Sequence, residues 1–152
     1  MMLLLGECPG KRYSASMAMK SRSKVEWKDL RVLVVDDMPA MRSILTDMLN
    51  TCGIAQVQEL EDADSAWEVL ASGARDFPDI VLLDVVLPGM SGLDLVRAIR
   101  GHGRMAAIKI LMVTSEGRLD HVEEAMRAGA DGYLVKPFEE NRLADSLVAL
   151  LS

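Results

Sequence analysis

Arg31-Val32-Leu33-Val34-Val35-Asp36-Asp37 decides the fold, because a run of aliphatic residues without alternation stops abruptly at two carboxylates. Short runs that are apolar on both faces are typical of strands buried in a parallel sheet. Two other runs have this form: residues 79–83 stop at Asp84, and residues 131–135 stop at Lys136. Since parallel strands bind ligands beyond their carboxyl ends, we expect three carboxylates and one ammonium group to converge at one sheet edge.

Segments with helical periodicity separate these apolar runs. We predict helices near residues 39–52, 63–70, 93–100, 119–126 and 143–151. Pro39 suits a first helical turn, Asp62 an N-cap, and Gly53 and Gly129 helix ends. Residues 55–60 alternate between polar and apolar side chains, which indicates a strand at the sheet edge. The whole pattern predicts a doubly wound (βα)₅ domain of the α/β class.

Composition and charge limit the functions that this chain can have. Its 152 residues leave room for one well-formed core. The net charge is −6, but residues 1–24 carry +4 and the remainder carries −10. A folded part this acidic argues against nucleic-acid binding. Residues 1–26 have no periodicity and are interpreted as a flexible extension before a domain at residues 27–152.

Cysteine usage and hydropathy predict a cytoplasmic protein that does not enter a membrane. Cys8 lies in the N-terminal extension, and Cys52 ends a predicted helix on its apolar side, as a buried thiol would. The absence of a disulfide framework suits a reducing compartment. No apolar stretch approaches the length of a membrane span or a signal-peptide core.

The predicted carboxylate cluster requires a counterion. Bare carboxylates about 4 Å apart repel by roughly 4 kcal/mol at an effective dielectric constant near 20. Oxygen ligands of this kind suit Mg²⁺, and a dication held by a few carboxylates takes phosphate as a further ligand. Asp36, Asp37 and Asp84 are therefore candidate magnesium ligands, and Lys136 supplies a second positive charge.

Other phosphate-binding and hydrolytic motifs are absent from the sequence. The turn Asp36-Asp37-Met38-Pro39 has no glycine to cradle a pyrophosphate, and no Walker-type sequence occurs. Gly89-Met90-Ser91-Gly92 lacks the spacing of a nucleophile elbow. His102 and His121 lie in polar stretches without a partner at metal-ligand spacing, so we predict that both are surface residues.

Five separated motifs agree in order and spacing with one known family. They are Val34-Val35-Asp36-Asp37, Leu83-Asp84, Leu87-Pro88-Gly89-Met90-Ser91-Gly92, Val113-Thr114-Ser115 and residues 128–138. From about Leu30 to Ser152 the chain resembles the receiver domain of bacterial response regulators, especially the stand-alone type used in chemotaxis. The resemblance implies a flavodoxin-like sheet with strand order 2-1-3-4-5, an order that is carried over from the family.

The resemblance also implies a mechanism for this site. Asp84 would be the phosphoacceptor and would take its phosphoryl group from a sensor histidine kinase. Asp36, Asp37, Asp84 and the main-chain carbonyl of Val86 would hold Mg²⁺, while Lys136 neutralises the phosphoryl oxygens. Positioning and charge neutralisation of this kind carry most of phosphoryl-transfer catalysis. Self-phosphorylation and autodephosphorylation would be the only chemistry of a signalling switch that is not an enzyme.

Switching follows from the same resemblance. Thr114 would be drawn toward the phosphoryl group, and Tyr133 would turn inward into the vacated space. The face formed by the helix near residues 119–126, the strand near 132–135 and the helix near 143–151 would then change its affinity for a downstream protein. A monomer or transient dimer is expected, without an output domain because the chain stops after the last helix.

Two alternative functions share parts of this pattern. A phosphorelay shuttle, which passes its phosphoryl group to a histidine phosphotransfer protein, would have the same site and stays open at this point. A haloacid-dehalogenase-type phosphatase needs a second carboxylate two residues after the nucleophile, where this chain has Val86. The resemblance implies that the position of Val86 helps set how quickly an acyl phosphate hydrolyses; a valine side chain cannot orient water by hydrogen bonding, whereas Glu116 could.

Overall fold

Five parallel strands form one sheet in the computed structural model, which describes residues 26–72 and 76–152. The strands are β1 (Arg31–Val35), β2 (Gln56–Leu60), β3 (Ile80–Leu83), β4 (Lys109–Thr114) and β5 (Gly132–Val135). The α-helices are α2 (Pro39–Thr51), α3 (Ala63–Ala71), α4 (Gly92–Arg100), α5 (Leu119–Ala128) and α6 (Glu140–Leu151), and the 3₁₀ helices are η1 (Trp27–Asp29) and η2 (Gly103–Met105). The expected extension at residues 1–26, with Cys8, lies outside the described residues except for Glu26.

The strand order is β2-β1-β3-β4-β5, which confirms the doubly wound α/β fold and the expected order. β1 lies between β2 and β3, and the order reverses there, so the carboxyl ends of β1 and β3 are adjacent. Val35 is in register with Leu83. Asp36 and Asp84, the next residue in each chain segment, therefore leave the sheet side by side.

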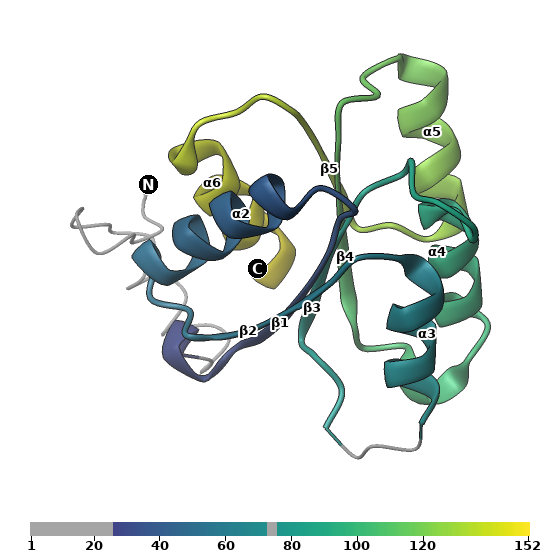
Figure 1. Ribbon diagram of the computed structural model, residues 1–152, viewed down its shortest axis with the longest axis horizontal. Helices are drawn as coiled ribbons and strands as arrows, with labels where there is room; N and C mark the ends of the chain where they lie inside the picture. The colour runs from purple at the N-terminus through teal and green to yellow at the C-terminus, as the bar shows by residue number, and fades with distance from the viewer. Residues whose placement is uncertain (1–25, 73–75) are drawn as a thin grey trace.

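The helices cover the sheet in two layers, with α2 and α6 on one face and α3, α4 and α5 on the other (Figure 1). Alternation along the central strands sends Val32 and Val34 toward the first layer, and Leu33 and Val35 toward the second. All four side chains are buried. Full burial of such a side chain stabilises the fold by about 1.5–3 kcal/mol, so both cores depend on uninterrupted apolar strands.

Local boundary signals predict most of the helix ends correctly. Pro39 is the first residue of α2, and Asp62 caps α3 by accepting a hydrogen bond from the Ser65 amide at 2.7 Å. Gly53 and Gly129 have φ angles of +97° and +120°, a left-handed backbone that favours glycine at helix ends. β2 lies at the sheet edge, as its alternating sequence predicts.

The position of Cys52 agrees with its prediction, whereas that of His102 does not. Cys52 is buried at the end of α2. His102 is only half-exposed, since its ring lies edge-on to Trp67 with ring centroids 6.3 Å apart. Its Nδ1 is buried and has no hydrogen-bond partner among the described residues. The loop after α4 turns this ring toward α3, a tertiary contact that the polar flanking sequence does not indicate.

None of the helices in residues 26–72 and 76–152 combines the length and hydrophobicity needed to cross a membrane.

Candidate functional site

Three carboxylates converge at the carboxyl ends of β1 and β3. Asp36, Asp37 and Asp84 each offer an oxygen, and these oxygens lie within 4.8 Å of one another. Asp36 is 1% exposed and Asp84 is 8% exposed, whereas Asp37 faces solvent. Two nearly buried anions and one open anion form a cluster that is accessible from a single side.

Lys136 supplies the positive charge of this cluster. Its Nζ donates to Asp36 Oδ2 at 2.8 Å and to Asp84 Oδ2 at 3.1 Å. Burial alone lowers the pKa of Lys136, but the hydrogen bonds and charges of Asp36 and Asp84 outweigh burial and raise it above the ordinary value. The side chain therefore stays an ammonium group at neutral pH and joins two residues that are 100 and 52 positions away in the sequence.

Main-chain groups orient the two buried carboxylates. The Met38 amide donates to Asp36 Oδ1 at 2.9 Å, and the Val86 amide donates to Asp84 Oδ1 at 3.2 Å. Gly92 packs directly against the main chain of Asp84, because a Cβ at this position would lie 2.0 Å from the Asp84 carbonyl oxygen. The loop after β3 can close over Asp84 only with glycine at this position.

Thr114 and Tyr133 flank the cluster on β4 and β5. Thr114 is the last residue of β4, and its side chain is fully buried. It accepts a hydrogen bond from the Glu116 amide at 3.3 Å. The Tyr133 hydroxyl donates to the Glu116 carbonyl at 2.5 Å. Partial burial, together with the charges of Glu116 and Asp84, raises the pKa of Tyr133.

The donor set fits a hard divalent cation. Carboxylate oxygens within 4.8 Å of one another can share one ion, and Mg²⁺ is bound in proteins by one or two carboxylates together with water and phosphate oxygens. The half-open arrangement, with Asp37 exposed, leaves room for such additional ligands. The Val86 side chain is 62% exposed and has no atom that could bind a metal ion, so only its main-chain carbonyl is a candidate ligand.

Two contacts of the site were not predicted from the sequence. Arg42 donates to the Asp36 carbonyl at 2.7 Å and lies 3.5 Å from Glu59 on β2, so it ties the β1–α2 loop to the edge strand. His121 is 37% exposed, in agreement with its predicted surface position, but its Nδ1 also contacts the Glu116 carboxylate at 2.6 Å. Arg42 and His121 each lie one or two helical turns beyond the end of a strand. This position is the only feature of the sequence that could have indicated their contacts.

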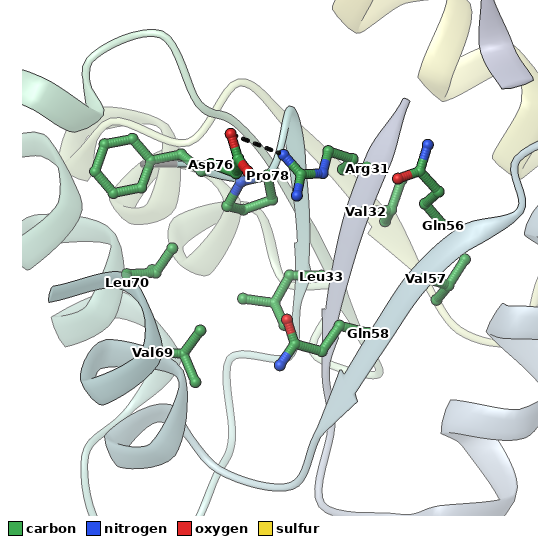
Figure 2. Close-up of a pocket in the computed structure, with 11 residues that line it drawn as sticks. Arg31, Val32, Leu33, Gln56, Val57, Gln58, Val69, Leu70, Asp76 and Pro78 are labelled. Atoms are coloured by element: carbon green, nitrogen blue, oxygen red, sulfur yellow. Dashed lines mark ion pairs between the residues drawn. The ribbon is translucent and has the colours of Figure 1, made fainter. Parts of the chain in front are cut away.

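A separate hollow of about 270 Å³ lies at the opposite ends of β1 and β2, beside α3 (Figure 2). Its lining is mostly aliphatic and amide side chains, with one ion pair at 3.5 Å between Arg31 and Asp76. None of the clustered carboxylates lines it. Residues 76–78, which form one wall, directly follow residues 73–75, which the structure does not describe. The acidic cluster therefore remains the candidate site.

Comparison with known proteins identifies the family. The family model described as response regulator receiver domain matches residues 32–148, a span that includes the whole acidic cluster. The chain belongs to the receiver domain family.

Relatives of this receiver domain match over most of their length. It is 38% identical over 118 residues to the chemotaxis protein CheY of Pseudomonas aeruginosa, covering 78% of this chain and 93% of that protein. Chemotaxis protein CheY-3 of Vibrio cholerae is 37% identical over 120 residues, with coverages of 79% and 90%. The structure of Vibrio cholerae CheY4 superposes with a TM-score of 0.71 at 32% identity and covers 80% of this chain and 98% of that chain.

Membership of the family gives the acidic cluster a functional context. Receiver domains are signalling switches of two-component systems, and this chain has the fold and the sequence of a response regulator. Receiver domains typically use Mg²⁺ at an acidic pocket, and Asp36, Asp37 and Asp84 form an acidic cluster in this chain.

Proposed function

We propose that Asp84 accepts a phosphoryl group from a phosphohistidine of a sensor kinase, in a reaction that depends on Mg²⁺. The observation that carries this proposal is the contact of one ammonium group, Lys136, with both Asp36 and Asp84 inside the carboxylate cluster. A purely structural ion pair needs one carboxylate, and burying a second one costs free energy unless the cluster binds further positive charge.

The chemistry requires one bond to form and one to break. An oxygen of the Asp84 carboxylate attacks phosphorus, the P–N bond to the kinase imidazole breaks, and the departing nitrogen keeps the electron pair. Lys136 lies 3.1 Å from Asp84 and pairs with a phosphoryl oxygen as the product forms. Thr114 follows Met112 and Val113 on β4, next to the end of β3, and its hydroxyl donates to another phosphoryl oxygen. Lys136 neutralises charge on the transferring phosphoryl group, and the Thr114 hydroxyl stabilises it by hydrogen bonding.

Asp36, Asp37, Asp84 and the main-chain carbonyl of Val86 are the residues that would hold Mg²⁺. When bound, the ion supplies positive charge to the phosphoryl oxygens and offsets the repulsion between the carboxylates. Of these residues, Asp37 is exposed to solvent and Asp36 is buried.

The partner-binding face is proposed to be α5–β5–α6. Movement of Thr114 toward the phosphoryl group changes the position of the β4–α5 loop. Tyr133 moves with this loop, because its hydroxyl donates a hydrogen bond to the Glu116 carbonyl. Three large apolar side chains are exposed on these elements: Leu119 at 71% and Met126 at 42% on α5, and Val135 at 39% on β5. Phosphorylation alters partner affinity only through contacts that differ between the two states of this loop.

The proposed setting is a cytoplasmic pathway in which residues 27–152 form the receiver unit, as a monomer or transient dimer. Relatives named chemotaxis proteins in two organisms support a chemotaxis role for its downstream target. The acidic surface argues against a nucleic-acid partner, since the chain carries a net charge of −6. Turnover as an enzyme is not part of the proposal, because the phosphoryl group stays on the protein until water removes it.

The test is phosphorylation by a small acyl phosphate. Wild type, Asp84→Asn and a matched control, Asp94→Asn on the exposed side of α4, are incubated with acetyl phosphate and Mg²⁺ and followed by intact mass. Wild type and Asp94→Asn should gain one phosphoryl group, and a chelator should prevent the gain. Equal uptake by Asp84→Asn would contradict the acceptor assignment.

A further inference from the structure

The β4–α5 loop contains one residue, Glu116, that three other residues hold through three different groups. Its amide donates to Thr114 Oγ1 at 3.3 Å, its carbonyl accepts from the Tyr133 hydroxyl at 2.5 Å, and its carboxylate lies 2.6 Å from His121 Nδ1. The loop and the start of α5 lie at the top of the view in Figure 1, beyond the carboxyl end of β4. Glu116 therefore connects the site to the first turn of α5.

His121 determines where the side chain of Glu116 lies. An ionised carboxylate only accepts hydrogen bonds, so Nδ1 of His121 carries the hydrogen and donates it. His121 is the third residue of α5, and its own amide is bonded to the Arg118 carbonyl and Asp120 Oδ1. The contact therefore joins the side chain of a loop residue to the first turn of α5.

A released Glu116 carboxylate would be close enough to affect the phosphorylated acceptor. The Glu116 amide donates to the Thr114 hydroxyl at 3.3 Å, and Thr114 ends β4 beside the end of β3, which Asp84 directly follows. Val86, two residues after Asp84, has no side-chain group that can orient water by hydrogen bonding, whereas the Glu116 carboxylate can. A carboxylate that accepts a hydrogen bond from water assists its attack as a general base.

We propose that His121 is a positioning residue that holds the Glu116 carboxylate on α5 and away from the acyl phosphate, which lengthens the lifetime of the phosphorylated state. This inference rests on the proposed function, since it assumes phosphorylation of Asp84. The pair is 37–38% exposed, so its role is to select a side-chain position rather than to stabilise the fold.

The test measures decay of the phosphorylated protein. Wild type, His121→Leu, His121→Gln, Glu116→Ala and the double variant are phosphorylated with acetyl phosphate, freed of the donor and followed by intact mass. His121→Leu should decay about two- to tenfold faster, the range that corresponds to loss of one hydrogen bond. The amide of His121→Gln can still donate and should restore slow decay. In the Glu116→Ala background, His121→Leu should have no effect, and Glu123→Ala, an exposed glutamate of α5, is the matched control for that background.

Each result decides between clear alternatives. Normal uptake with unchanged or slower decay of His121→Leu would overturn the role of His121 alone. Equal acceleration with and without Glu116 would also overturn it, because the effect would then not pass through the carboxylate. Failure of the wild type to take up a phosphoryl group would overturn the proposed function together with this inference.

Discussion

Replacement of Lys136 by methionine tests whether the ammonium group holds the acidic cluster together. Methionine keeps the length and apolar stem of lysine but removes its charge. The wild-type ammonium lies 2.8 Å from Asp36 and 3.1 Å from Asp84, and the side chains of the three residues are 11%, 2% and 10% exposed. Lys136→Met therefore leaves two nearly buried carboxylates without their shared partner.

The expected loss of stability is large because solvent screens these charges weakly. Breaking a buried ion pair by removing one partner costs about 3–5 kcal/mol. Since the carboxylates reach solvent on one side, we expect about 3 kcal/mol without Mg²⁺, a substantial part of the roughly 5–15 kcal/mol of a typical domain. Addition of Mg²⁺ should stabilise Lys136→Met more than wild type, because the ion no longer competes with the ammonium group.

Urea denaturation followed by circular dichroism, with chelator and with Mg²⁺, measures both quantities. Lys28→Met, the same substitution at an exposed lysine of η1, is the matched control and should change the unfolding free energy by less than about 0.5 kcal/mol. A loss below about 1 kcal/mol for Lys136→Met in chelator, within the range of a surface pair, would refute the electrostatic reasoning. An equal response of wild type and variant to Mg²⁺ would refute the competition between the two cations.

Three other perturbations address the loop, the metal and the aromatic residue. Gly92→Ala places a Cβ 2.0 Å from the Asp84 carbonyl and should abolish phosphorylation, whereas Gly103→Ala, with nothing within 4 Å, should not; equal phosphorylation of both would contradict the packing argument. Asp37→Asn should weaken Mg²⁺ binding by at least about tenfold, because loss of a group that only hydrogen-bonds to a metal ligand can already have this effect. The substitution should have little effect on stability in chelator, and calorimetry of Mg²⁺ binding measures the change in affinity. Tyr133 has a raised pKa, so its contribution to stability is complete below its unfolded pKa of about 10 and is lost as pH rises through the higher folded value. The alkaline loss of stability should therefore be smaller in Tyr133→Phe, and identical pH profiles would contradict the shift.

The sequence alone determines the elements and the ends at which the chemistry lies. Uninterrupted apolar runs such as residues 31–35 must be buried on both faces, and this requirement is local. Asp36, Asp84 and Lys136 could be assigned to strand ends because each directly follows such a run. Burial of these runs and the start of a helix at Pro39 could both be predicted without any knowledge of tertiary contacts.

The order of the strands was not contained in the residue pattern and came from resemblance to a family. Parallel strands with similar aliphatic sequences can pair in several orders, since the hydrogen bonds between them use only the backbone. Placement of β1 between β2 and β3 decides that Asp36 lies beside Asp84. Lys136 then meets the Asp36 carboxylate, 100 residues away, only because β1, β3, β4 and β5 follow one another across the sheet.

Side-chain partners were decided by the tertiary structure alone. The polar sequence around His102 and His121 does not indicate that one ring packs against Trp67 or that the other contacts Glu116. Polar flanking residues cannot distinguish a solvated histidine from one that contacts a neighbouring helix or loop, because the partner is specified by packing in three dimensions. Arg42, whose guanidinium reaches back to the Asp36 carbonyl, belongs to the same class of contacts that only the folded chain defines.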